Sequence, residues 1–499
     1  MSKWATYLLL FFSSVLGAQA QTVLANCSSA TLQAALNAVA ADGAVIVLPA
    51  QSCTWTTPVI YTQTFSVTIQ GQTTCTGTPA SSCTDNTVIT HAITGDSAAL
   101  QVTTPLGKSF RLTGITFTGG NANQWTGGIR IYGRSQQVRI DQVHFKNISN
   151  TAIATDGVLG VMDHDVFDIS NNMEGWRPLN TSWNGIGQSG DNSWADDTGL
   201  GTNKFFFLED STVNGVGQQG GATNDCFSGG RYVVRHNVLN DSSVQGHTTG
   251  HAGDDRGCRA QEFYQNTMPA PAGGIIGFNA VDLESGPAMI WGNTVSGYSN
   301  FITAHIKRED NLTYTQQPTP TGWGYCGSAV SGVGSAWDQS STSATGYACI
   351  DQLGRGKGDL LAGLFPSKIN TALGNAIAWP RQALEPVYEW NNSWSCPSCG
   401  GSFWANYDSG TQQNRDFYLF TASFNGTTGV GSGLISARPS TCALNVGYWA
   451  TDQSTLYQCS TANTWTVYYK PYTYPHPLAA GALPPPPPKP ASGLVATPK

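Results

Sequence analysis

The sequence predicts an all-β protein: a right-handed parallel β-helix (solenoid) with an N-terminal cap helix and a C-terminal hairpin. Three observations support this fold class. Only 11% of the residues are charged whereas 57 are glycine, a balance typical of turn-rich, all-β extracellular proteins. A six-residue apolar pattern recurs along the chain at intervals that suit one short-stranded coil. Asparagines occupy the same position in three consecutive copies of that pattern.

The repeat has apolar residues at its first and last positions. Seven copies keep both: Leu112–Phe117, Ile140–Phe145, Met162–Phe167, Leu208–Val213, Val234–Leu239, Phe263–Met268 and Ile290–Val295. An eighth copy, Glu389–Trp394, keeps only the last. Their fourth positions lie 28, 22, 46, 26, 29, 27 and 99 residues apart, so five of the seven spacings suit one coil each. The two long spacings indicate inserted loops or extra coils. A β-sandwich or propeller is less favoured, because closely spaced hairpin turns are not the dominant pattern.

The fourth positions form a column that begins apolar and becomes polar: Ile115, Val143, Asp165, Ser211, Asn237, Asn266, Asn293 and Asn392. Asparagine tolerates the left-handed backbone of a turn, and its amide can bond the amide one coil away. We therefore expect Asn237, Asn266 and Asn293 to stack.

The start of the chain predicts a lid for the first coil. Leu32, Ala35, Leu36 and Val39 recur at helical spacing within Thr31–Ala41, and Ser28 or Ser29 can cap this helix. A strand is expected at Ala44–Pro49. A helix followed by a strand can cover the open end of a solenoid.

The chain divides into four parts. Residues 1–20 have the lysine, apolar run and Ala-Gln-Ala site of a signal peptide, so we expect a secreted, extracellular (or periplasmic) protein that starts at Gln21. Residues 21–395 form the β-helix domain, in which 301–386 is a long inserted excursion. Residues 396–475 form a C-terminal, disulfide-tied β segment that includes a hairpin at Tyr448–Tyr469. Residues 476–499 are a Pro-rich tail, and the proline run that follows Leu483 forms a stiff, extended segment that cannot join a core.

All 12 cysteines lie beyond the signal peptide, which fits an oxidising compartment. The simplest pairing joins sequence neighbours: Cys27/Cys53, Cys75/Cys83, Cys226/Cys258, Cys326/Cys349, Cys396/Cys399 and Cys442/Cys459. Other pairings stay open, because sequence alone does not fix connectivity.

The net charge of −7 argues against nucleic acid as a partner, since nucleic-acid binding needs a basic surface. No stretch after the signal peptide is apolar enough to span a membrane. We expect a monomer whose partner is a polysaccharide.

The second position of each repeat should face solvent, because the first and last positions face the core. These positions form a stripe of carboxylates, one arginine and aromatics: Asp141, Asp163, Glu209, Arg235, Tyr264, Trp291 and Trp390. Aromatic faces stack on sugar rings, and clustered carboxylates bind Ca²⁺ or transfer protons. An ordinary solvated face is the alternative interpretation.

A second cluster lies between the coils of Arg235/His236 and Glu262/Tyr264. It contains two histidines, two carboxylates and two arginines on a glycine-containing loop: His247, His251, Asp254, Asp255, Arg256 and Arg259. Such a loop can supply acid, base and anion-binding groups. Alternatively, its charged residues form a salt-bridge network that pins the loop.

Several segments resemble known proteins. The cap helix with Val45–Pro49, Val67–Gly71 and Val161–Phe167 resemble the pectate-lyase-like (pectin-lyase-fold) β-helix superfamily, over roughly Thr31–Asn300. Gly230–Asn237, Arg256–Glu262 and Cys349–Arg355 resemble bacterial secreted β-helix proteins of unassigned activity. Members of the superfamily mostly cleave polysaccharides, so the resemblance implies that activity by analogy of fold.

We therefore expect a lyase that cleaves a uronate-containing polysaccharide by β-elimination. The expected Ca²⁺ ligands are Asp141, Asp163 and Glu209. The expected catalytic residues are Arg235, His247, His251, Asp254, Asp255, Arg256 and Arg259, and the expected substrate-binding residues are His236, Glu262, Tyr264, Trp291 and Trp390.

Two other functions stay open. A glycoside hydrolase of polygalacturonase-like type is suggested by short elements that resemble that family: Thr155–Gly157, Asp196-Asp197, Gly250-His251 and His305–Arg308. A non-catalytic glycan-binding or adhesin β-helix would use the stripe only to stack sugars.

Overall fold

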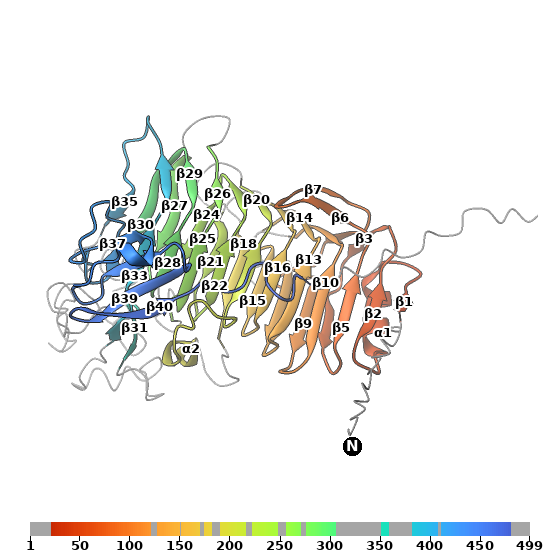
Figure 1. Cartoon of the computed structure of the whole chain (residues 1–499). Helices are drawn as coiled ribbons and strands as arrows, with labels where there is room; N and C mark the ends of the chain where they lie inside the picture. The colour runs from red at the N-terminus through yellow and green to blue at the C-terminus, as the bar shows by residue number, and fades with distance from the viewer. Residues whose placement is uncertain are drawn as a thin grey trace, which may run out of the picture.

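The computed structural model describes residues 21–120, 127–149, 151–169, 174–181, 190–215, 222–247, 256–270, 276–305, 351–358, 382–407 and 411–480. They form the predicted parallel β-helix, whose coils lie side by side from the N-terminal end to the C-terminal end (Figure 1). Ten coils contribute one strand to each of three parallel sheets, which we call A, B and C, and sheet A has one further strand at each end.

Sheet A comprises β1 (Gln21–Val23), β2 (Ala44–Val47), β5 (Val67–Gln70), β10 (Ser109–Thr113), β13 (Gln137–Asp141), β16 (Gly160–Asp163), β19 (Phe206–Glu209), β22 (Arg231–Arg235), β25 (Ala260–Tyr264), β28 (Ala288–Trp291), β33 (Val387–Trp390) and β36 (Phe417–Tyr418). Sheet B comprises β3 (Ser52–Trp55), β8 (Val88–His91), β11 (Thr116–Gly119), β14 (His144–Ile148), β17 (Val166–Asp168), β20 (Thr212–Asn214), β23 (Val238–Asn240), β26 (Thr267–Met268), β29 (Thr294–Ser296) and β34 (Ser393–Ser395). Sheet C comprises β4 (Val59–Thr62), β9 (Leu100–Thr104), β12 (Ile129–Gly133), β15 (Ile153–Asp156), β18 (Glu174–Leu179), β21 (Ala222–Cys226), β24 (Ser243–Gly246), β27 (Ile276–Leu283), β30 (Tyr298–Ala304) and β35 (Trp404–Asn406).

The repeat predicted from sequence is the passage from sheet A to sheet B. Its first and last positions, such as Leu112 and Phe117 or Val234 and Leu239, are at most 1% exposed and line the interior of the coils. The turn between them has two residues. The first of these has a left-handed backbone, as at Gln142 (φ 57°) and His236 (φ 56°).

The predicted asparagine column is confirmed. Asn237 Nδ2 donates to Asn266 Oδ1 (3.1 Å), Asn266 Nδ2 to Asn293 Oδ1 (3.1 Å), and Asn293 Nδ2 to Asn392 Oδ1 (2.8 Å). Each Oδ1 also accepts the backbone N–H of the preceding coil. The left-handed residue, however, is the one before the asparagine. The asparagine is selected for its amide, which satisfies buried backbone groups, rather than for its backbone conformation.

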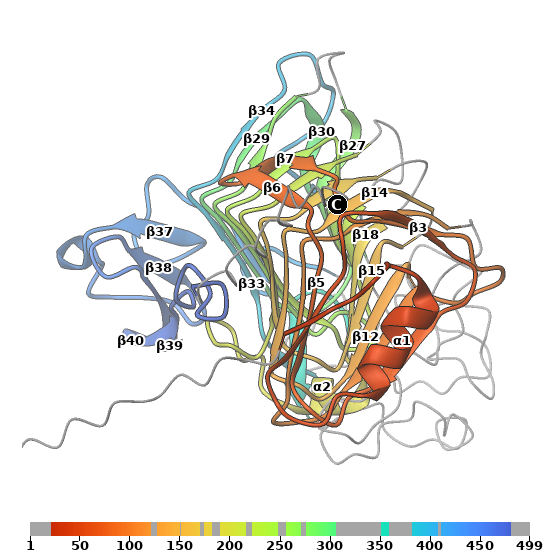
Figure 2. The same cartoon turned by 90° about the vertical axis from the view of Figure 1, so that its right-hand side faces the viewer.

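The N-terminal end is closed as expected. Helix α1 (Ser29–Asn37) ends four residues earlier than predicted, and the hydroxyl of its N-cap Ser28 accepts from the N–H of Thr31 at 3.2 Å. Leu32 and Leu36 of the helix are buried against the first coils. Figure 2, which looks along the coils, shows α1 over the open end.

The β-helix continues beyond residue 395, since β35 and β36 still extend sheets C and A. The predicted C-terminal hairpin is part of a four-stranded sheet, in the order β37 (Val430–Gly433), β38 (Gly447–Ala450), β39 (Thr455–Thr461) and β40 (Thr464–Tyr469). This C-terminal sheet packs beside sheet A, on the side of the molecule away from sheet C (Figure 2).

Smaller elements leave the coils. They are the hairpin β6 (Thr74–Gly77)–β7 (Ala80–Thr84), the short helix α2 (Asp191–Ala195), the antiparallel pair β31 (Arg355–Gly358)–β32 (Gln382–Leu384), and a 3-10 turn at Ile435–Ala437. Strand β30 (Tyr298–Ala304) still pairs in sheet C. The inserted excursion begins after this strand, later than the predicted residue 301.

Five predicted disulfides are present: Cys27–Cys53, Cys75–Cys83, Cys226–Cys258, Cys396–Cys399 and Cys442–Cys459. The sixth couple, Cys326/Cys349, lies outside the described residues, as do the signal peptide and residues 481–499 of the tail. Among the helices described, none is long and apolar enough to cross a membrane.

Candidate functional site

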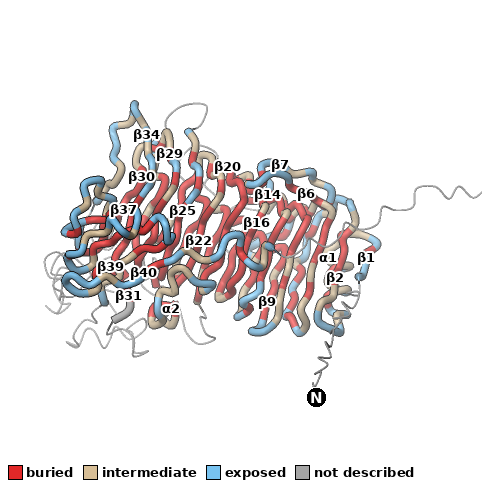
Figure 3. The backbone as a smooth tube through the Cα atoms, viewed as in Figure 1, coloured by how far each residue is buried: buried red, intermediate tan, exposed pale blue. Residues whose placement is uncertain are grey.

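The predicted stripe on sheet A lies under the C-terminal part of the chain. Its members point away from the interior of the coils, as expected, but none is more than 8% exposed: Asp141, Asp163, Glu209, Arg235, Tyr264, Trp291 and Trp390. The C-terminal sheet and the segment 470–480 pack over this face (Figure 3). The prediction of a solvent-facing groove on this sheet is therefore wrong.

The three carboxylates expected to hold Ca²⁺ are engaged by arginines instead. Each accepts charge-assisted hydrogen bonds of 2.6–2.9 Å, in the pairs Arg111–Asp141, Arg139–Asp163 and Arg235–Glu209. Because each charge is already matched by a guanidinium, these residues do not fit a calcium site. Within the described part of the chain, no group of three or more His, Cys, Asp or Glu residues is arranged to hold a metal ion.

Arg235, expected to be catalytic, anchors the C-terminal segment. Its side chain is fully buried and pairs with Glu209 at 2.7 Å. It also donates to the hydroxyl of Tyr264 (2.9 Å) and to the backbone carbonyls of Tyr472 and Thr473 (2.8 and 2.9 Å). A guanidinium with this many fixed partners has a structural role.

The aromatic residues of the stripe stack on one another and do not present open ring faces to a sugar. The rings of Tyr264 and Trp291 lie 4.6 Å apart, and those of Trp291 and Trp390 lie 5.8 Å apart. Trp449 of β38 packs against both tryptophans at 5.1 Å. Their expected role as an open binding surface is wrong, because the C-terminal sheet occupies the faces that a sugar would need.

His236 and Glu262 are also held by the C-terminal region. The His236 ring stacks on Tyr474 at 3.6 Å, and burial together with the charge of Arg235 lowers the pKa of His236 to about 4. Glu262 accepts from the hydroxyl of Tyr469 at 2.8 Å, and burial raises its pKa to about 7. Neither side chain is placed to bind a polymer on this face.

The arginines of the loop cluster form the salt-bridge network that was the alternative interpretation, with partners far away in sequence. Arg256 donates to both carboxylate oxygens of Asp351 (2.8 and 2.6 Å), and Arg259 donates to both of Glu385 (3.3 and 2.6 Å). The ring of Trp194 lies 4.9 and 5.2 Å from their guanidinium carbons. Both arginines are buried, so their predicted catalytic role is not supported.

The same cluster contains one predicted residue in a different environment. His247 follows β24 directly, and its side chain is 19% exposed on the outer face of sheet C. His251, Asp254 and Asp255 lie outside the described residues.

Two rows of polar side chains run across the outer face of sheet C. The first row follows the strand register through Asp225, Gln245, Asp282 and Thr303, whose neighbours Val244, Val281 and Ile302 face the core. Side chains two residues further along each strand share this face. The second row is therefore His247, Glu284, His305 and Tyr407, which continue the same backbone ladder.

Histidines and carboxylates alternate in these rows. His247 Nδ1 lies 3.7 Å from Asp225 Oδ1, and its Nε2 lies 3.6 Å from Glu284 Oε2. His305 Nε2 lies 3.6 Å from Asp282 Oδ1, which also accepts from the hydroxyl of Thr303 at 2.8 Å. These histidine–carboxylate contacts are longer than the arginine–carboxylate contacts on sheet A.

Glu174 is the acid of this site. Burial and the neighbouring charge of Asp225 raise its pKa to about 8, although Arg177 and the hydroxyl of Thr151 act in the opposite direction. Arg177 Nη2 lies 2.5 Å from Glu174 Oε2, and Thr151 Oγ1 donates to the same oxygen at 3.0 Å. Glu174 is therefore largely protonated at neutral pH, beside a guanidinium and a carboxylate.

An aromatic ring connects the arginine to the histidine. The Arg177 guanidinium lies 5.4 Å from the centre of the Phe227 ring, and that ring meets His247 edge-on at 6.3 Å. At the other end of the row, Tyr407 stacks on His305 at 4.6 Å and is 57% exposed. Here, unlike on sheet A, an aromatic face remains open.

We call Glu174, Arg177, Asp225, His247 and Glu284 the sheet C site. It combines an acid that is protonated at neutral pH, a fixed cation and a histidine between two carboxylates. Perturbed carboxyl groups beside a charge partner are typical of catalytic sites. In the repeat, the turns from sheet A to sheet B have only two residues, so the longer connections of the fold run from sheet B to sheet C and from sheet C to sheet A. These connections flank sheet C.

His247 was predicted from the sequence, whereas the other four members of the sheet C site were not: Glu174, Arg177, Asp225 and Glu284. The repeat was aligned on the passage from sheet A to sheet B, where spacing is constant. The strands of sheet C follow connections of variable length, so no fixed period leads to them. A useful signal was the alternation of apolar and acidic residues in Val281–Glu284.

The described residues of the polygalacturonase-like elements contact different partners. Asp156 accepts from the hydroxyl and N–H of Thr181, and Asp196 lies 3.7 Å from the ammonium of Lys204. His305 belongs to the polar rows of sheet C.

The chain was compared with known proteins. No family model matches it, and no curated protein sequence matches it. Two solved structures are similar: an alginate lyase from Paenibacillus sp. str. FPU-7 (14% identity, 55% of this chain and 94% of that chain, TM-score 0.28) and ORF18 of Geobacillus virus E2 (10% identity, 55% and 54%, TM-score 0.28).

Proposed function

We propose that the protein is a secreted enzyme that cleaves a uronate-containing polysaccharide by β-elimination at the sheet C site. One observation carries the proposal: Glu174, with a pKa raised to about 8, lies beside Arg177 and Asp225, and Asp225 lies beside His247. The five disulfides fit an oxidising, extracellular environment.

The reaction makes three demands on the site. The proton on the carbon next to the uronate carboxylate must be removed, the negative charge that develops on that carboxylate must be offset, and the leaving oxygen must be protonated. The electron pair of the broken C–H bond becomes a C=C bond as the bond to the leaving oxygen breaks.

The residues of the sheet C site match these demands. Arg177 and the protonated Glu174 are a cation and a hydrogen-bond donor for the substrate carboxylate. His247 takes the proton and, as imidazolium, donates it to the leaving oxygen. Asp225 and Glu284 on either side of its ring stabilise the imidazolium.

A second function is favoured by one specific feature. A protonated carboxyl group beside an ionised one is the arrangement of glycoside hydrolases, in which the acid protonates the leaving oxygen and the carboxylate acts as nucleophile or base. Glu174 and Asp225 resemble this pair in having one raised pKa, although their direct hydrogen bond brings them closer than the roughly 5–9.5 Å between the two groups of a hydrolase. The two reactions assign different roles to Glu174, so one substitution separates them.

The test is Glu174→Gln, assayed on a panel of uronate-containing and neutral polysaccharides. Unsaturated uronate absorbance and new reducing ends are measured together. A lyase keeps its activity within about tenfold, because the amide still donates a hydrogen bond, whereas a hydrolase loses about 10²–10⁴-fold with its general acid. In the lyase, wild-type activity falls as pH rises through about 8, where Glu174 ionises, and the variant does not show this fall.

Glu262→Gln is the matched control. Glu262 is also a buried carboxyl with a pKa raised to about 7, but it lies under the C-terminal sheet. Its substitution should leave both turnover and the fall near pH 8 unchanged. A wild-type protein that releases neither unsaturated nor reducing ends from any polysaccharide of the panel would overturn the proposal in favour of glycan binding alone.

A further inference from the structure

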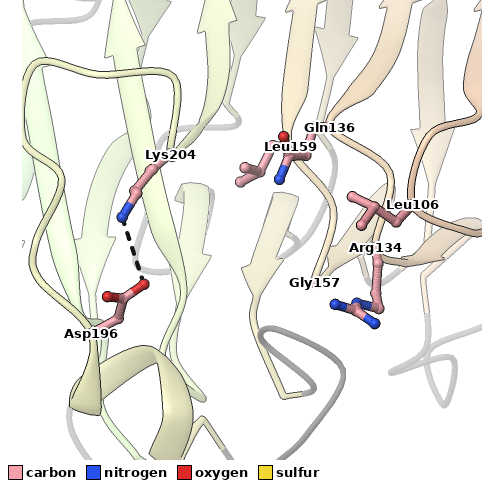
Figure 4. A pocket seen from close by; sticks show the side chains of 7 residues that line it. All are labelled: Leu106, Arg134, Gln136, Gly157, Leu159, Asp196 and Lys204. Carbon is pink, nitrogen blue, oxygen red and sulfur yellow. Dashed lines mark ion pairs between the residues drawn. The ribbon is translucent and has the colours of Figure 1, made fainter.

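A small polar hollow lies at the corner where sheet C turns into sheet A. It has room of about 170 Å³ and is lined by Leu106, Arg134, Gln136, Gly157, Leu159, Asp196 and Lys204. Figure 4 shows Arg134 beside Leu106 on one side and the pair Lys204–Asp196 on the other. Two cations and one carboxylate give the hollow a net positive charge.

The hollow has a fixed frame. The N–H groups of Arg134 and Ser135 both donate to the carbonyl of Thr104 in the preceding coil (2.7 and 3.1 Å), and the N–H of Leu159 donates to the carbonyl of Ser135 (2.9 Å). Gly157 has a left-handed backbone (φ 74°) that turns the chain away from the rim. Three successive coils therefore hold their turns in register around it.

The opposite wall is held just as firmly, although its loop is an insertion between β18 and β19. The carbonyl of Asp196 accepts from Arg259 at 2.9 Å, and its carboxylate lies 3.7 Å from Lys204. Arg231 donates to the carbonyls of Asp197 and Thr198 at 2.7 and 2.6 Å. Part of the buried arginine network thus positions this wall.

The hollow lies at the edge of sheet C, the sheet that carries the sheet C site. Arg134 and Gly157 directly follow strands β12 and β15, whose outward side chains include Arg130, Tyr132 and Asp156. Arg130 lies 5.2 Å from the centre of the Tyr132 ring and 3.5 Å from Asp156. Three inter-strand spacings separate β12 from β21, which places the hollow on the order of 14 Å from Asp225 along the coils.

Charge is distributed unequally along this face. The end around Arg130, Arg134 and Lys204 has three cations against the two carboxylates of Asp156 and Asp196, whereas Asp282 and Glu284 at the other end face His305 and His247. An acidic polymer is attracted to the end that carries this excess of cations. The size of the hollow suits one sugar unit or its charged substituent, since sites for larger ligands have roughly 300–1,000 Å³.

We propose that this hollow is a subsite for one anionic sugar unit, which lies between Arg134 on one wall and Lys204 on the other. Arg134 offers a planar pair of N–H donors, and Lys204 offers a point charge that Asp196 keeps in position. The inference rests on the proposed function for its substrate class, and it adds a subsite that fixes which end of an acidic chain lies toward β12.

The test measures binding, so it does not depend on turnover. A tetrasaccharide of uronate units is titrated calorimetrically into Arg134→Gln, Lys204→Gln and the control Lys146→Gln, which removes an exposed cation on sheet B. Loss of one charge-assisted contact should weaken binding about tenfold for each of the first two variants and leave the control unchanged. The carboxyl-reduced tetrasaccharide should bind all three variants and the wild type equally.

Each outcome decides the inference. Unchanged affinity of Arg134→Gln and Lys204→Gln, an equal loss with the carboxyl-reduced sugar, or no binding of the acidic sugar by the wild type overturns it. Selective loss in both variants supports it, even if no polysaccharide is cleaved, in which case only the proposed function fails. Cleavage with normal affinity in both variants would retain the function and remove the subsite.

Discussion

The outer faces of sheets A and C carry similar residues and have different environments. On sheet A, carboxylates and arginines pair at 2.6–2.9 Å and the aromatic rings are covered by the C-terminal sheet. On sheet C, histidines lie 3.6–3.7 Å from carboxylates, and Tyr407 at the end of the row is 57% exposed.

Residue type alone therefore does not distinguish an internal interface from a candidate binding face. The distinction is one of degree, because Arg177, Asp225 and Glu284 on sheet C are also at most 8% exposed and Arg177 lies 2.5 Å from Glu174. The side chains of Glu174 and His247 are the most exposed of the sheet C site, at 16% and 19%. The following predictions separate the two faces by measuring stability and activity on the same variants.

The largest effect is expected from His247→Ala on sheet C. Removal of the base should lower turnover about 10²–10⁴-fold, while the midpoint of thermal unfolding stays close to that of the wild type because the side chain is partly exposed. Turnover and thermal unfolding are measured on the same preparation. A variant that keeps full turnover, or that unfolds at a much lower temperature, would make His247 a structural residue like those of sheet A.

Arg235→Ala on sheet A should act in the opposite way. It leaves Glu209 buried without its cation and frees two carbonyls of the C-terminal segment, so we expect a loss of about 3–5 kcal/mol in the free energy of unfolding. Chemical denaturation measures this. The control is Arg130→Ala on sheet C, whose side chain is 34% exposed and whose removal should cost less than about 1 kcal/mol.

A smaller effect is expected inside the coils, which both faces share. Asn266→Ala removes an amide that bonds Asn293 and two backbone carbonyls, so unfolding should be easier by about 1–3 kcal/mol. Asn240→Ala is the control, since its amide makes one bond to Asn214 near the surface of sheet B. Equal losses would mean that the column adds nothing beyond an ordinary side-chain hydrogen bond.

The fold was predictable because its signals are local and periodic. Apolar first and last positions must fill the interior of every coil, so Leu112 and Phe117 reveal the strand register without any knowledge of distant contacts. Asn237 and Asn266 reveal the stacking direction in the same way. Five cysteine couples followed from proximity in sequence, because each closes a short local structure: Cys75–Cys83 lies in the β6–β7 hairpin and Cys226–Cys258 joins consecutive coils.

The candidate functional face was less predictable because its identification depends on contacts between distant segments. Nothing near Tyr264 or Trp291 in sequence shows that residues from 449 to 476 will cover them. Likewise Arg256 looked catalytic beside His251, whereas its partner Asp351 lies 95 residues away. The positions of charged residues in the sequence identify candidate site residues. Which outer face they leave accessible depends on the C-terminal segment, which packs on sheet A.

The smallest effect comes from two stacked histidine–tyrosine pairs, one on each face. His236 and Tyr474 lie 3.6 Å apart on sheet A, where the Tyr474 hydroxyl donates to Asp210 at 2.6 Å, and His305 and Tyr407 lie 4.6 Å apart on sheet C. Tyr474→Ala should lower the midpoint of thermal unfolding and leave oligosaccharide affinity unchanged, because its ring fixes the chain's own C-terminal segment. Tyr407→Ala should leave the midpoint unchanged and weaken affinity about two- to tenfold, since one aromatic stacking contact contributes about 0.5–1.5 kcal/mol. Calorimetric titration and thermal unfolding of both variants give all four values, and a loss of affinity in Tyr474→Ala alone would assign the binding face to sheet A.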